Sequence, residues 1–230
     1  MRDPAHGPLP GILIALTLVT GIVDAVSYLR FGHVFVANMT GNVVFLGFGL
    51  AGDRDVSAGA SLISIAAFAA GAFGGGRLGS LLGAHRGRLI FAAVIIKVAL
   101  VAAAVLIALF ATPLDANRQY LLIVLLALTM GVQNAVVRRV AVPDLTTTVL
   151  TLTITGLAAD GAWTGARTAQ SRRRLMSVAA MLVGALIGGL MVYHFGVAAG
   201  LSCALAVLAG TGLYSWSRTR ETTAAWSAAR

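Results

Sequence analysis

The sequence has few of the residues on which most catalytic and metal sites depend. Its single cysteine, Cys203, excludes a disulfide or a thiolate metal cluster within one chain. The four histidines are isolated and show no metal-ligand spacing. No serine elbow, phosphate-binding loop or pair of carboxylates is present. We therefore expect no enzymatic activity, no cofactor and no metal.

Charge is also scarce, because charged residues make up only 11% of the 230 positions, against about a quarter in soluble domains. Hydrophobic residues make up 58%, and the mean hydropathy is +0.90. A spanning helix needs roughly 20 mostly apolar residues. Six windows meet this requirement, at residues 9–29, 57–76, 89–111, 119–137, 175–195 and 197–216. The sequence therefore predicts an all-α polytopic membrane protein.

We expect one membrane domain over residues 1–230, with a polar C-terminal tail at 217–230. The first window is too long for the apolar core of a signal peptide, and no small-residue cleavage site follows it, so it should remain in the mature protein. The net charge of +9 comes from arginines in short connections and in the tail, which membrane topology explains. The expected partner is the lipid bilayer and not nucleic acid. A homodimer is a further expectation, because 230 residues is small for a transporter.

One short cluster of residues occurs twice. Gly21-Ile-Val-Asp24-Ala-Val is followed 110 positions later by Gly131-Val-Gln-Asn134-Ala-Val. Two further matches occur in the same order, and one of them contains the pairs Gly71/Gly75 and Gly184/Gly188, whose spacing favours close helix packing. These matches pair residues 66–75 with 179–188 and residues 49–53 with 156–160. The pattern predicts two internal repeats, at 9–111 and 119–216, each with three long helices and one polar-interrupted segment.

The interrupted segments, at residues 34–52 and 143–160, decide the topology. If both span the membrane, the chain crosses eight times and the halves are parallel; if both are re-entrant, it crosses six times and the halves are inverted. Positive residues concentrate in cytoplasmic loops. The eight-span model divides the arginines ten against six, and the re-entrant model thirteen against three. We therefore favour six full spans in a bacterial inner membrane with both termini cytoplasmic, although residues 34–52 are apolar enough to span.

Asp24 is the most notable polar residue in an apolar segment. An intramembrane carboxylate is costly and marks an ion pathway, a proton relay or an ion pair, unless it lies near the interface and caps a loop. Its counterpart Asn134 has the same shape but cannot ionise. Lys97, the only lysine, lies within another apolar window and either forms an ion pair with Asp24 or extends to the nearer interface.

The densest polar cluster in an apolar stretch belongs to the first interrupted segment. Its side chains either line a substrate or ion site or bond to other helices, and Gly41 permits a break or a close backbone approach. The threonines of the second segment present the same choice, with bonding to their own helix as a further alternative. The candidate site residues are Asp24, Asn38, Thr40, Gly41, Asn42, Asn134, Thr148 and Thr151.

Several of these runs resemble one family of proteins. They are residues 20–29, residues 32–42, Asn134-Ala with Arg138-Arg139, and residues 147–151. Together they are similar to the YoaK family of bacterial integral membrane proteins, over about residues 10–215. The family tends to carry Thr-Gly where this chain has Thr151-Leu152, so a break in the second segment is less expected here. The resemblance implies transport of a small molecule or metabolite.

The function predicted from the residues and the resemblance is transport of a small-molecule metabolite, coupled to protons through Asp24. The alternative is a non-transporting membrane scaffold or partner-binding subunit. In a scaffold, hydrogen bonds would fill the polar cluster, and no crevice would lie beside Asp24 and Thr40.

Overall fold

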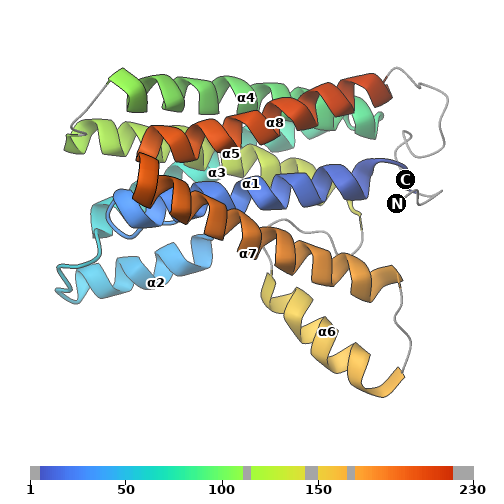
Figure 1. Ribbon diagram of the computed structural model, residues 1–230, viewed down its shortest axis with the longest axis horizontal. Coiled ribbons are helices and arrows are strands. Elements are labelled where there is room, and N and C mark those ends of the chain that lie inside the picture. The colour runs from blue at the N-terminus through green and yellow to red at the C-terminus, as the bar shows by residue number, and fades with distance from the viewer. Residues whose placement is uncertain (1–5, 111–114, 143–149, 165–168, 220–230) are drawn as a thin grey trace.

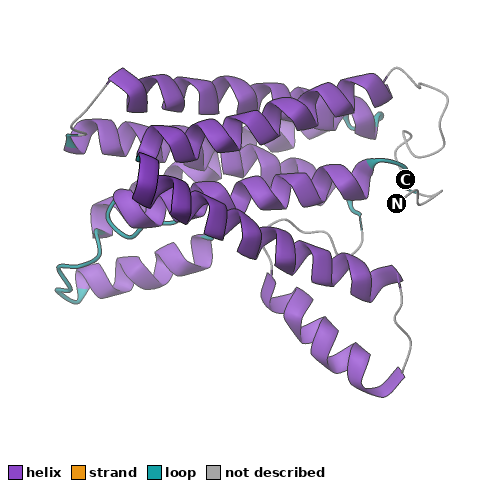
Figure 2. Cartoon of the chain, in the orientation of Figure 1, coloured by secondary structure: helices purple, strands orange, loops and turns teal. Residues whose placement is uncertain are grey.

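The computed structural model describes residues 6–110, 115–142, 150–164 and 169–219 (Figure 1). These residues form helices joined by loops, and no strand occurs among them (Figure 2). The all-α prediction is confirmed. The helices are α1 (Leu9–Arg30), α2 (Met39–Leu50), α3 (Ala58–Leu82), α4 (Arg86–Phe110), α5 (Ala116–Val140), α6 (Leu150–Thr164), α7 (Ala169–Phe195) and α8 (Val197–Thr219).

Six of these helices are long and apolar enough to cross a membrane, which confirms the six expected spans: α1, α3, α4, α5, α7 and α8. By contrast, α2 has 12 residues. At 1.5 Å per residue it is about 18 Å long, well short of the roughly 30 Å hydrocarbon core of a bilayer. It is therefore too short to cross a membrane as a single helix.

Local sequence explains where several helices begin and end. Ser57 caps α3, since its hydroxyl accepts a hydrogen bond from the Ala60 amide at 3.1 Å. Asp115 caps α5 in the same way, through the Arg118 amide at 2.8 Å. Between α7 and α8, Gly196 has a φ of 86°, which only glycine adopts without strain. The chain therefore turns back sharply after α7.

The first interrupted segment enters and leaves at the same end of the bundle. The Ser57 amide donates to the Gly32 carbonyl at 3.4 Å, and His33 Nδ1 lies 2.7 Å from the Asp55 carbonyl oxygen. The chain thus returns after α2 to the point at which it left α1. This is the re-entrant arrangement, and the eight-span alternative does not describe this segment.

The second half runs in the opposite direction to the first. In Figure 1, α5 ends and α7 begins at the same end of the bundle, with α6 lying against α7. That end is also where α1 begins and α8 ends. Part of this second segment, 143–149 and 165–168, lies outside the described residues.

Glycines bring two pairs of parallel helices into backbone contact. On α1, a Cβ at Gly21 would collide with the Met181 carbonyl of α7; on α5, a Cβ at Gly131 would collide with the Phe68 carbonyl of α3. Reciprocally, Gly184 faces Leu18. Small residues permit this approach, as their spacing predicts. The α1–α7 pair and the α3–α5 pair are called the two units below.

The two units use corresponding residues. Gly71 faces Leu128 across the α3–α5 contact as Gly184 faces Leu18 across the α1–α7 contact. Gly71 and Gly184 are 113 positions apart, and Leu18 and Leu128 are 110 positions apart, which are the offsets of the sequence repeat. The internal repeat remains a prediction, which these matched contacts support. Helices α4 and α8 pack on the units and on each other, while α1 and α5 are the most buried of the spanning helices.

Candidate functional site

Asp24 lies on α1 and holds the extended backbone that leads into α2. Its side chain is buried, and Oδ1 accepts hydrogen bonds from the amides of Val36 and Ala37, both at 2.9 Å. Oδ2 accepts one from Asn38 Nδ2 at 2.5 Å. Backbone amides without partners are costly inside a membrane. The carboxylate therefore meets a need created by the break before α2.

Asn42 completes the same arrangement from α2. Its side chain is buried, accepts from the Phe35 amide at 2.8 Å and donates to the Phe35 carbonyl at 2.6 Å. It also donates to Ser64 Oγ on α3 at 3.1 Å, and the Ser64 hydroxyl donates to the Phe35 carbonyl at 2.7 Å. The segment before α2 is thus bound to α1 through Asp24 and to α3 through Asn42.

The remaining candidates of the first segment do not join these contacts. Thr40 is exposed on the surface of α2. Gly41 lies under the Phe35 ring, because a Cβ there would come within 2.7 Å of the ring. That ring stacks against both Tyr28, at 5.2 Å, and Phe45, at 5.7 Å. Gly41 therefore permits close packing, as its lack of a side chain predicts.

The candidate residues of the second half do not form a matching polar cluster among the described side chains. The side-chain amide of Asn134 donates to the Met130 carbonyl of its own helix at 2.9 Å. Thr151 is exposed. Thr148 lies outside the described residues. The structure therefore shows a polar anchor for the first interrupted segment; of the candidates in the second half, it places Asn134 on α5 and Thr151 on α6.

A second group of buried polar side chains lies at the centre of the bundle. Lys97 on α4 is completely buried and donates to Gln133 Oε1 on α5. Gln133 Nε2 donates to Thr20 Oγ1 on α1 at 2.9 Å, and Thr20 donates to the Leu16 carbonyl at 2.9 Å. This chain of hydrogen bonds connects three helices.

These contacts correct both expectations for Lys97. Its ammonium group contacts Gln133 and not Asp24, whose oxygens bind residues 36–38. Nor does it extend to an interface, since none of the side chain is exposed. Gln133 and Thr20 were not predicted as site residues from the sequence. Their positions could have indicated a role, because Gln133 lies inside the second copy of the repeated cluster and Thr20 directly precedes the first copy.

A small cavity adjoins this central group. Its volume is about 10 Å³, close to the least that admits one water molecule. Apart from Lys97 and Gln133, its lining is apolar: Leu16, Ile90, Ala93, Val94, Val136 and Val137.

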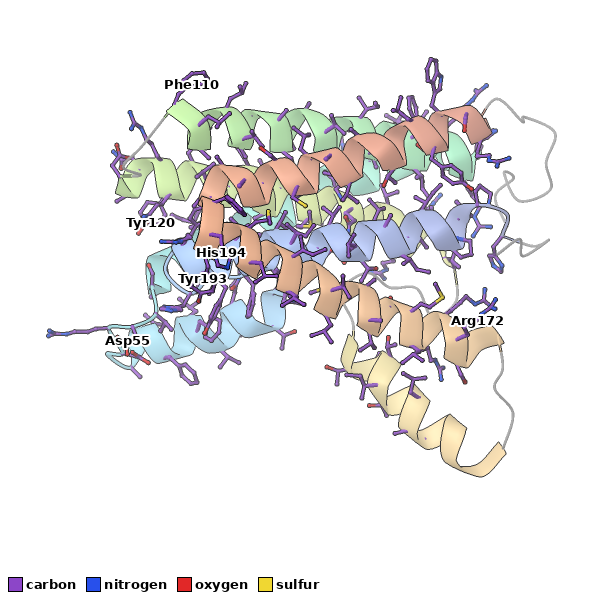
Figure 3. The ribbon with its side chains drawn as sticks, viewed as in Figure 1. Asp55, Phe110, Tyr120, Arg172, Tyr193 and His194 are labelled. Carbon is purple, nitrogen blue, oxygen red and sulfur yellow. The ribbon has the colours of Figure 1, made fainter. Side chains whose placement is uncertain are left out.

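Charge differs between the two ends of the bundle. Figure 3 shows Arg172 at one end and Asp55 at the other. Three acidic residues, Asp53, Asp55 and Asp115, belong to the Asp55 end, and so do three arginines, Arg30, Arg54 and Arg118. The other end carries Arg77, Arg86, Arg88, Arg138, Arg139, Arg172, Arg173, Arg174 and Arg218. The arginine-rich end is the one at which α1 begins.

Comparisons with known proteins agree with this architecture. Residues 12–214 match a family model described as "Protein of unknown function (DUF1275)". The chain is also 32% identical, over 153 residues, to the UPF0700 transmembrane protein YoaK of Bacillus subtilis (strain 168). That match covers 65% of each protein, so it spans just under two thirds of the relative's length. No solved structure matches the chain. The chain therefore belongs to the DUF1275 family and is an integral membrane protein related to YoaK.

Proposed function

We propose that this protein transports a small-molecule metabolite across the bacterial inner membrane by movement of one unit relative to the other. The observation that carries the proposal is the position of the buried polar side chains. Thr20 belongs to the α1–α7 unit and Gln133 to the α3–α5 unit, and the two are hydrogen-bonded to each other at the centre of the bundle, where Lys97 of α4 donates to Gln133. Polar groups at this depth mark a solute or ion pathway.

The contacts within and between the units differ in kind. Within each unit, glycines place backbone against backbone, so the paired helices fit in one arrangement. Between the units, Thr20 and Gln133 meet through side-chain hydrogen bonds, which water or a solute can replace. Broken segments that enter from the two faces are a recurring design of secondary transporters. Movement at the junction between units would open the centre to one face at a time.

Asp24 is the proposed site of proton coupling. The re-entrant segment is bound to one unit through Asp24 and to the other through Asn42 and Ser64. Protonation of the carboxylate would turn one of its acceptor oxygens into a donor, facing amide donors. The segment would then be held less tightly on the α1 side, so a proton could control its position.

The test is uptake of a panel of labelled metabolites into liposomes containing the purified protein, with and without an inward proton gradient. The wild type should accumulate at least one solute faster when the gradient is present. Asp24→Asn should lose this dependence on the gradient. Thr40→Val, on the exposed side of α2, is the matched control and should keep it. An Asp24→Asn variant that still responds to the gradient would remove the coupling role.

A non-transporting scaffold is the second candidate, and one observation favours it. Asp24 and Asn42 already have protein partners for their polar atoms, as in a cluster that only holds helices together. The same liposomes distinguish the two candidates. A folded, inserted protein that increases the flux of no solute in the panel would favour the scaffold.

A further inference from the structure

Lys97 is a buried cation whose charge no described side chain balances. Its side chain is completely buried, and the ammonium group donates to the neutral amide of Gln133. An ammonium group has three N–H donors, and Gln133 Oε1 accepts one of them. Lysines inside a membrane protein normally pair with an opposite charge or line a pathway.

The described carboxylates are engaged elsewhere. Asp24 accepts hydrogen bonds from residues 36–38 through both of its oxygens. Asp53, Asp55 and Asp115 lie at one end of the bundle and are exposed. Asp160 lies on α6, which contacts α7 and not α4, the helix of Lys97. In the described part of the chain, therefore, Lys97 has no carboxylate within ion-pair distance, and a charge from outside the protein would fit there.

The surroundings of Lys97 also suit a visiting solute. The small cavity adjoins both Lys97 and Gln133, and the polar junction of the two units passes through the same place. One water molecule is close to the limit of the cavity. A larger anion would enter only as α1 and α5 separate, which is the movement that transport requires.

We propose that Lys97 and Gln133 form an anion-binding site, so that the transported solute carries a monovalent anionic group such as a carboxylate. This inference rests on the proposed transport function. An inorganic anion such as chloride offers the same charge, so chloride and carboxylate are tested separately. Rings and points of positive charge select anions in membrane pores on the same principle.

The sole lysine permits a direct measurement of binding. Formaldehyde with a borane reductant methylates amines, and in this chain the amines are Lys97 and the amino terminus. Lys97→Arg gives the signal of the amino terminus alone. We expect sodium acetate or lactate, at about ten times its dissociation constant, to slow methylation of Lys97 about tenfold. Sodium chloride and sodium gluconate are run in parallel; protection by chloride alone would identify an inorganic anion as the ligand.

Gln133→Glu is the decisive variant. It preserves the shape of the side chain and supplies the missing negative charge beside Lys97. Protection by anions should therefore disappear, and transport of anionic solutes should fall about tenfold or more, while the protein stays folded. Gln133→Leu leaves Lys97 charged, and so it should keep part of the protection.

The outcomes separate this inference from the proposed function. If Lys97 is methylated at a rate that no anion changes, and neutral or cationic solutes are still transported, the anion site is wrong and the transport function stands. If the reagent never reaches Lys97 in the folded protein, the anion site is also wrong. The absence of flux for every solute would overturn the transport function itself.

Discussion

At the scale of single residues, Asp24 shows how one carboxylate holds non-helical backbone inside a membrane. Residues 36–38 precede α2, and their amides have no helical partner. The buried carboxylate accepts from two of these amides and from the Asn38 side chain. Hydrogen bonds to a charged acceptor are stronger than those to a neutral one. Asp24 therefore stabilises the backbone before α2, in addition to its proposed role in proton coupling.

Replacing this carboxylate should loosen the segment before α2. Asp24→Asn keeps one acceptor oxygen but places an NH2 group where Oδ1 or Oδ2 accepts hydrogen bonds. We expect a loss of about 2 kcal/mol in the free energy of unfolding in detergent. Hydrogen exchange should become faster at the amides of Val36 and Ala37. Thr40→Val, which contacts solvent or lipid, should change neither quantity measurably.

The candidate site was only partly predictable from the sequence. An intramembrane Asp24 near Asn38 and Asn42 was visible, because polar residues stand out in apolar runs. That Asp24 binds the backbone amides of Val36 and Ala37 was not, since every non-proline residue carries an amide. The partner of Lys97 depends on how α4, α5 and α1 rotate about their axes. Periodicity in these almost uniformly apolar helices does not specify that rotation.

At the scale of elements, the two units depend on glycine. A Cβ on Gly21 would meet the carbonyl of Met181 and the backbone of Ala185, neither of which can move without shifting α7. Since α1 is among the most buried helices, a displaced α7 would also disturb the centre of the bundle.

Gly21→Ala and Gly131→Ala should both destabilise the protein. The added methyl group would overpack a backbone contact, at a cost of about 2 kcal/mol or more in the free energy of unfolding. Gly76→Ala is the matched control on α3, because nothing lies within 4 Å of its Cβ position. It should be neutral or stabilising by up to about 1 kcal/mol, since alanine favours helix. Thermal unfolding in detergent measures all three. Equal effects at Gly21 and Gly76 would contradict the role assigned to the α1–α7 contact.

At the scale of the whole molecule, the distribution of arginine matches the folded arrangement. The nine described arginines at the end where α1 begins face three arginines and three aspartates at the other end. Arginine counts predicted this arrangement, because topology is set by charge in the loops and not by contacts between helices. The sequence could not reveal how tightly the first interrupted segment is bound, since this depends on Asn42 and Ser64 meeting across two helices.

The arginine-rich end should face the cytoplasm. Asp55→Cys and Arg172→Cys place thiols at opposite ends, both at exposed positions, in a Cys203→Ala background (Figure 3). In intact spheroplasts, an impermeant maleimide should label the thiol at position 55 and not the one at 172. Inverted membrane vesicles should give the reverse. Labelling of both positions from one side would contradict the six-span arrangement.

The contact between Gly32 and Ser57 has a consequence for engineering. Since a backbone hydrogen bond joins these residues, the intervening chain forms a cassette whose two ends lie at one point. A cassette from a relative could be grafted between them without altering the direction of any spanning helix. Chimeras of this kind would show whether solute selectivity is determined by the re-entrant segment or by the spanning helices around it.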